Sequence, residues 1–161
     1  MTIVHLAAAA ALLLQSTAAP KPAAQKPAGP AKAAPASTDL RVTLTYRGKG
    51  VVDEKHKLIA WMFTDPNITS ASLPVGTETA TRNGATITFK NASATPVYVF
   101  AVYDQTGSYD GVGGPPPAGL PCAIYKKAAK GAPAAVSAGG APIVFTLTDA
   151  EHWNTSGACR P

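Results

Sequence analysis

The chain has 161 residues, enough for one domain of ordinary size together with short terminal segments. Its formal net charge at pH 7 is +5, from 14 Lys and Arg against 9 Asp and Glu. Three of the lysines fall in one proline-rich segment and the rest of the chain is close to neutral, so we expect no nucleic-acid partner.

The first 18 residues are predicted to be a signal peptide. The stretch from Ile3 to Leu14 is apolar except for His5, and it is too short to cross about 30 Å of hydrocarbon as a helix. Ser16 and Ala18 fit the small-x-small pattern of a cleavage site, so we place the cleavage after Ala18. A buried N-terminal helix is the alternative, but the stretch has no polar face. No other segment is long and apolar enough to span a membrane, so we expect the mature chain to be periplasmic or secreted, without a transmembrane segment.

Residues 19–37 are rich in Pro, Ala and Lys, and we expect them to form a disordered linker. Prolines disfavour a helix and favour extended polyproline II, and the segment has too little apolar surface to fold alone. Lys21, Lys26 and Lys32 lie in this segment. The composition predicts a solubilising tether; weak attraction to an anionic cell-wall polymer is the alternative.

The residues from 38 to 153 predict an all-β domain, because short apolar runs of period two alternate with turn residues. The continuous apolar run at 58–63 indicates a central strand. No amphipathic helix of useful length is present, so the predicted fold is a single antiparallel β-sandwich of about seven strands. Five strands are expected with shorter candidates between them: 42–46, 58–63, 85–89, 97–103 and 144–148, then 73–79, 123–125 and 134–136.

The large aromatic residues of these strands are expected in the core of the sandwich, not in a cofactor or sugar site. A domain of about 115 residues buries an independent core without further help. The residues concerned are Trp61, Phe63, Phe89, Phe100 and Phe145.

The two cysteines, Cys122 and Cys159, predict a disulfide. An even pair in a small exported domain forms a bond in an oxidising compartment. This bond would attach the C-terminal tail, residues 154–161, to the body of the domain. A metal site is the alternative, but zinc sites need four ligands at close spacing.

A loop with Asp at each end and Gly between them follows the strand at 97–103. Asp104 and Asp110 flank Gly107, and such a loop directs carboxylates and carbonyls towards one point, as Ca²⁺ requires. The oxygen count is low, because only two side chains are charged and no Glu follows. Two alternatives stay open: a weak Ca²⁺ site at Asp104 and Asp110, or carboxylates that accept backbone N–H groups and hold a tight turn. No other cofactor is expected.

The residues around this loop carry a family resemblance. Pro96–Asp104, Gly107–Gly111 and Gly114–Gly119, together with Tyr46–Asp53 and His56, are similar to uncharacterised bacterial exported proteins. Those proteins have a transthyretin-like, carboxypeptidase-regulatory-like β-sandwich, so the resemblance implies an Ig-like or transthyretin-like fold over residues 40–145. It also implies a structural or binding module, and no catalytic residue carries over, because the matching positions are turn formers.

Three function hypotheses follow. The first is an exported, non-catalytic accessory or binding module of the cell envelope, with an envelope protein or a cell-wall surface as partner. The second is a small-ligand module for a carbohydrate or weakly bound Ca²⁺, using Tyr103, Tyr109 and the acidic loop. The third is a hydrolase that depends on Asp104 or His56. It is disfavoured because the sequence has no Gly-x-Ser-x-Gly elbow, HExxH or phosphate loop, and His56 and His152 are far apart.

Overall fold

The structure, a computed structural model, describes residues 38–92, 96–128 and 131–161. The predicted signal peptide (1–18) and linker (19–37) lie outside the described residues. The described part of the chain forms nine strands and no helix: β1 (Leu40–Tyr46), β2 (Leu58–Phe63), β3 (Gly76–Ala80), β4 (Thr86–Phe89), β5 (Tyr98–Tyr103), β6 (Cys122–Ile124), β7 (Ile143–Leu147), β8 (His152–Trp153) and β9 (Cys159–Arg160). Within these ranges, no helix of membrane-spanning length and hydropathy is found.

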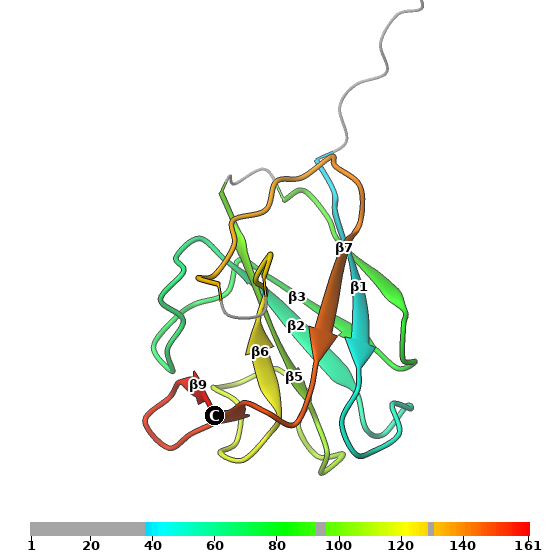
Figure 1. Ribbon diagram of the computed structural model, residues 1–161, viewed down its shortest axis with the longest axis vertical. Helices are drawn as coiled ribbons and strands as arrows, with labels where there is room; N and C mark the ends of the chain where they lie inside the picture. The colour runs from blue at the N-terminus through cyan, green and yellow to red at the C-terminus, as the bar shows by residue number, and fades with distance from the viewer. Residues whose placement is uncertain (1–37, 93–95, 129–130) are drawn as a thin grey trace, which may run out of the picture. The chain divides into compact units, whose positions relative to one another are not determined.

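Seven of the strands form two main sheets (Figure 1). One sheet has the order β4-β1-β7, and the other has the order β3-β2-β5-β6. The remaining strands, β8 and β9, pair only with each other, in antiparallel fashion. The predicted all-β sandwich is therefore confirmed, with the expected number of strands in its two main sheets.

One strand pair departs from the predicted antiparallel pattern. β1 and β7 run parallel and side by side, with Val42 opposite Ile143 and Tyr46 opposite Leu147 (Figure 1). Parallel strands need a long crossover connection, and here nearly the whole domain lies between the two strands. Alternation of apolar residues shows which side of a strand is buried, but it carries no information on the direction of the neighbouring strand.

The main core lies between the two sheets. In β1, Val42, Leu44 and Tyr46 are buried while Thr43 and Thr45 are only partly covered, as the period of two predicts. Strands of both sheets contribute to this cluster through alternate residues: Leu58, Ala60 and Met62 of β2, Ile87 and Phe89 of β4, Val99, Ala101 and Tyr103 of β5, and Phe145 and Leu147 of β7.

The opposite face of the four-stranded sheet is also buried. In β2, Ile59, Trp61 and Phe63 belong to a second cluster, separate from the main core. β5 and β6 contribute Phe100, Val102 and Cys122 to this cluster, and loops and β8 cover the face with Ile68, Leu120 and Trp153. The continuous apolar run at 58–63 is thus explained, because both faces of β2 are buried along its whole length.

The shorter strand candidates have mixed outcomes. The segment 73–79 contains most of β3, and 123–125 overlaps β6. The segment 134–136 contributes a single bridge, between Val136 and Val97. Short segments of this kind take their structure from neighbours in space, so their own pattern identifies them poorly.

Cys122 and Cys159 form the predicted disulfide, with their Cα atoms 5.9 Å apart. The bond joins β6 to β9, and β9 pairs with β8, where Trp153 packs against Phe100 at a ring-centroid distance of 5.3 Å. Residues 154–161, expected to be a tail, therefore contain the last strand. The disulfide is compatible with an oxidising compartment outside the cytoplasm.

Candidate functional site

An apolar pocket of about 360 Å³ lies on the outer face of the four-stranded sheet. Trp61 and Phe63 of β2, Phe100 of β5 and Trp153 of β8 line its base. Its walls come from two loops, 64–75 between β2 and β3 and 104–121 between β5 and β6. We refer to it below as the interloop pocket.

The first wall, loop 64–75, is held by short-range hydrogen bonds. The Asp65 carboxylate accepts the N–H of Asn67 at 2.7 Å, and the Ser72 hydroxyl accepts the N–H of Thr69 at 2.9 Å. These are the turns that Asp and Ser side chains favour. Ile68 anchors the loop in the second cluster, and Leu73 stays 86% exposed at the pocket.

The second wall, residues 109–116, is bonded to the sheet beneath it. The Trp61 indole N–H donates to the carbonyl of Gly111 at 3.3 Å, and the Tyr109 hydroxyl donates to the carbonyl of Gly114 at 2.9 Å. Gly111 has φ +80°, and a Cβ at this position would lie 2.6 Å from Cγ2 of Ile59. Only glycine lets the loop lie this close to β2. The next residue, Val112, is 72% exposed and lines the pocket.

Gly111→Ala is expected to loosen this wall and to lower the midpoint of thermal unfolding. Gly113→Ala is the matched control, because Gly113 has a similar φ of +83° but no atom within 4 Å of its added Cβ. Both variants carry the left-handed backbone penalty of about 1 kcal/mol, and only Gly111→Ala adds a clash of about 1–3 kcal/mol. Equal midpoints by calorimetry would show that the close approach to Ile59 is unimportant.

The interloop pocket has an uncharged lining. Its lining contains no charged residue and no histidine, so none of its hydroxyl groups has a base beside it within the lining. Burial and the nearby charge of Asp110 raise the pKa of Tyr109 to about 12, and the Tyr109 hydroxyl donates to the Gly114 carbonyl. The pocket therefore offers an uncharged apolar surface with a fixed shape.

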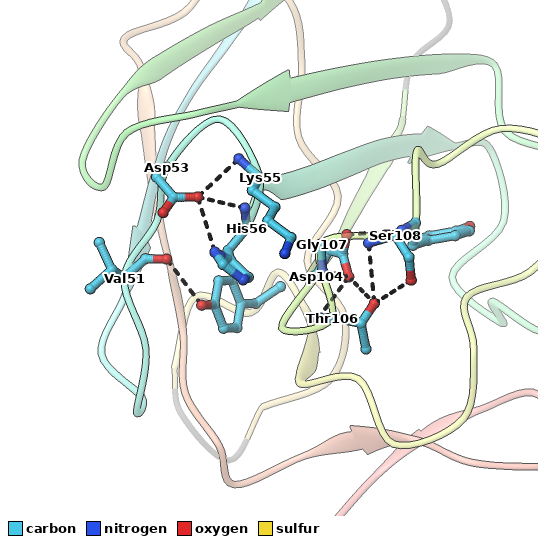
Figure 2. A network of polar contacts seen from close by, with 10 residues as sticks. Val51, Asp53, Lys55, His56, Asp104, Thr106, Gly107 and Ser108 are labelled. Atoms are coloured by element: carbon cyan, nitrogen blue, oxygen red, sulfur yellow. Dashed lines mark hydrogen bonds and ion pairs between the residues drawn. The ribbon is translucent and has the colours of Figure 1, made fainter.

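Asp104, one of the two predicted cation ligands, is 1% exposed and its carboxylate accepts hydrogen bonds from its own loop (Figure 2). Oδ1 accepts the N–H of Thr106 and of Gly107, both at 3.0 Å, and the Thr106 hydroxyl at 2.7 Å. Oδ2 accepts the N–H of Tyr109 at 2.9 Å. Asp104 thus fixes the position of Tyr109, whose ring packs 6.1 Å from that of Trp61 in the pocket lining.

Asp110, the other predicted ligand, is exposed and accepts the N–H of Val112 at 2.8 Å. The two carboxylates therefore bond to separate parts of the loop, and this geometry supports the turn-holding alternative over the Ca²⁺ alternative. Across residues 38–161, leaving aside the two short gaps, no group of three or more His, Cys, Asp or Glu side chains is placed to hold a metal.

The two tyrosines of the small-ligand hypothesis lie on opposite faces of the sheet. Tyr103 faces the main core, where its ring stacks on Tyr46 at 4.0 Å and its hydroxyl donates to the carbonyl of Val51 at 3.0 Å. Tyr109 faces the interloop pocket. The structure does not bring them together, because successive residues along β5 point to alternate faces and Tyr109 comes from the loop that covers the other face.

His56, named in the hydrolase hypothesis, pairs with Asp53 (Figure 2). Its Nδ1 lies 3.1 Å from Oδ1 of Asp53, and the same oxygen accepts the backbone N–H groups of Lys55 and His56. The N–H of His56, more than any other group, holds the pKa of Asp53 below its ordinary value. In the part of the chain that the structure describes, no hydroxyl group is hydrogen-bonded to the His56 ring. The pair closes a turn before β2.

Sequence reasoning missed the pocket itself. The aromatic residues of β2 and β5 were expected only as core, and Leu73 and Val112 were not singled out. A signal was present in the run at 58–63, because one interior between two sheets accounts for only one face of a strand. The second buried face requires loops to cover it, and apolar residues such as Leu73 and Val112 in those loops were the available clue.

No protein-family model matches this chain, and neither a curated protein nor a solved structure matches it. The resemblance to transthyretin-like exported proteins therefore stays a prediction.

Proposed function

We propose that this chain is an exported, non-catalytic β-sandwich module of the cell envelope, transthyretin-like in type, that binds an envelope partner through the interloop pocket. One observation carries the proposal: Leu73 and Val112, two of the most exposed large apolar side chains of the described residues, both line this one pocket. Apolar surface gathered at a preformed concavity is a feature of binding sites. A protein or wall surface is the proposed partner, and the oligomeric state is left open.

The proposed location is the periplasm or the cell exterior. The disulfide is compatible with an oxidising compartment. The apolar stretch from Ile3 to Leu14, followed by small residues, supports export, and the proline-rich linker after it would give the domain reach from an attachment point.

Photo-crosslinking in the native host tests this function. The photoreactive residue p-benzoylphenylalanine replaces Leu73 in one variant and Val144 in the control, since Val144 is 66% exposed on β7 and does not line the interloop pocket. We expect a discrete adduct with an envelope component from position 73 and none from position 144. No adduct at either position, or the same adducts at both, would contradict the proposal.

A small-ligand module is the second candidate, and the size of the pocket favours it. About 360 Å³ falls within the range of small-molecule pockets, roughly 300–1,000 Å³. A carbohydrate is the first ligand to test, by glycan-array binding of the purified chain. Weak Ca²⁺ binding at Asp104 and Asp110 is tested separately below.

A further inference from the structure

We infer that the interloop pocket takes an uncharged aliphatic or aromatic side chain, presented by a peptide segment of the partner protein. This inference rests on the proposed binding function and names the chemistry of the occupant. Four features of the pocket carry it: the charge of its lining, the state of its polar groups, the shape of its rim and the absence of cations from its walls.

Charge comes first. All 18 lining residues are uncharged, although elsewhere on the domain lysines and carboxylates form ion pairs such as Lys90–Asp39 and Lys126–Glu151. A charged group that entered the pocket would lose its hydration without gaining a counter-charge, which is costly. The occupant that complements this lining is therefore uncharged.

The polar groups of the pocket favour an apolar occupant over a sugar. Four of its polar side chains already make hydrogen bonds within the protein: the Trp61 indole and the Tyr109 phenol donate to the carbonyls of Gly111 and Gly114, and the hydroxyls of Thr69 and Ser72 bond within loop 64–75. The other polar side chains of the lining include the hydroxyls of Ser70 and Thr77. Trp61 and Phe100 are only 4% and 2% exposed, so neither residue offers an open ring face on which a sugar could stack. An apolar side chain needs neither a hydrogen bond nor an open ring face, and it gains about 25 cal/mol for each Å² buried.

The rim resembles a protein-binding hot spot. Leu73 lies on one wall, followed by Pro74 in the sequence. Val112 lies on the other wall, followed by Gly113 and Gly114. Hydrogen bonds within the loops hold both walls, so little conformational freedom remains to be lost on binding. A single side chain inserted between two apolar rim residues is the arrangement that concentrates binding energy in few contacts.

The walls also argue against a lipid surface. Attraction to the anionic membrane surface comes from clustered Lys and Arg, and no lining residue is a cation. Two basic residues that lie beside the acidic loop, Lys55 and Lys57, line a different pocket, together with Glu54 and Asp110. A peptide segment is therefore favoured over a membrane.

Selection from a random-peptide phage library tests the inference. The library is panned on the wild-type protein after depletion on the bare support, and selected peptides are synthesised with capped, uncharged ends. We expect them to share a Leu, Phe or Trp without neighbouring charge, and to bind the wild type in titration calorimetry. Leu73→Asp or Val112→Asp should weaken binding about tenfold or more, and Val144→Asp should leave it unchanged. These three positions are exposed, and near-UV circular dichroism checks that each variant keeps its packing.

Three outcomes would overturn the inference: peptides whose shared position is charged, peptides that bind Val112→Asp as well as the wild type, or binding of neutral glycans or of phosphatidylglycerol vesicles in place of peptides. Failure here differs from failure of the proposed function. If position 73 crosslinks to an envelope component while no apolar peptide is selected, the function stands and the inference falls. If apolar peptides bind while position 73 gives no adduct, the envelope function falls.

Discussion

Removal of the Cys122–Cys159 disulfide is expected to lower the free energy of unfolding by about 4 kcal/mol. The two cysteines are 37 residues apart in the sequence, and the bond between them closes a loop that includes β7 and β8. In the chain-entropy model, the crosslink restricts the unfolded chain, so removing it favours unfolding by an amount that grows with the logarithm of the loop length. The net stability of a domain of this size is about 5–15 kcal/mol, so the loss is a large share.

Removal of the disulfide should also loosen the packing of the β8–β9 hairpin. The disulfide holds β9 and, through it, the hairpin with β8, whose Trp153 packs on Phe100 and lines the interloop pocket. We expect the near-UV circular dichroism of the tryptophans to weaken in the Cys122→Ala/Cys159→Ala double variant. We also expect weaker binding of any peptide selected for the pocket.

Urea titrations of the wild type and of the double variant, each with and without dithiothreitol, provide the measurement. The difference between the two proteins should be about 4 kcal/mol without the reductant and should largely disappear with it, because the reductant removes the crosslink from the wild type. A difference below about 1 kcal/mol without the reductant would mean that β8, β9 and the surrounding packing hold the hairpin without the bond.

Asp104→Ala is expected to lower the free energy of unfolding by about 3 kcal/mol. The Asp104 carboxylate is buried and accepts three backbone N–H groups and one hydroxyl. Alanine would leave the N–H groups of Thr106, Gly107 and Tyr109 without this acceptor. Hydrogen bonds to a charged acceptor contribute about 1.5–3 kcal/mol each, and water can replace part of that at a loop on the surface. The variant should also lose affinity at the interloop pocket, since Tyr109 would no longer be positioned.

Asp110→Ala is the matched control for this variant. The Asp110 side chain is exposed and accepts one backbone N–H, from Val112, so we expect a loss of about 1 kcal/mol or less. Chemical denaturation of the two variants measures the contrast directly. Equal, small losses would show that the bonds to Asp104 do not stabilise the loop.

The same pair of variants decides between the two alternatives for the acidic loop. If the carboxylates only hold the turn, millimolar Ca²⁺ should leave the thermal midpoint of the wild type unchanged. If they bind Ca²⁺, the ion should raise the midpoint of the wild type, and both Asp104→Ala and Asp110→Ala should abolish the increase. Calorimetric titration with Ca²⁺ provides an independent measurement.

The elements with a strong local pattern were predictable from sequence. β1, β2, β4, β5 and β7 all overlap the runs that alternate or that are continuously apolar. The turn before β4 was also readable: Gly84 has φ +77°, and the side-chain amide of Asn83 exchanges hydrogen bonds with the backbone of Tyr46. The disulfide was predictable because a chain with two cysteines has only one way to pair them within itself.

Other features depend on neighbours that are distant in sequence. The parallel pairing of β1 with β7 brings together the first and the seventh strand, and nothing in either strand's own pattern specifies it. The acidic loop drew attention because of its charges, yet its carboxylates bond to their own backbone. The direction of those carboxylates depends on the path of the loop over β2. Gly111 permits the close approach of the loop to Ile59, and the hydrogen bond from the Trp61 indole to the Gly111 carbonyl holds the loop there.

The sequence by itself determined that the chain beyond residue 37 is an all-β domain, which residues face an interior, and which cysteines pair. These properties follow from the period of two along a strand and from composition, and both are local. Only the tertiary structure decided where a binding pocket lies. The interloop pocket is built from residues near positions 61–77, 100–116 and 153, and they meet because β2 and β5 are neighbours in one sheet while the disulfide holds β8 against its outer face. Sheet order arises from packing between distant segments, so no local pattern encodes it.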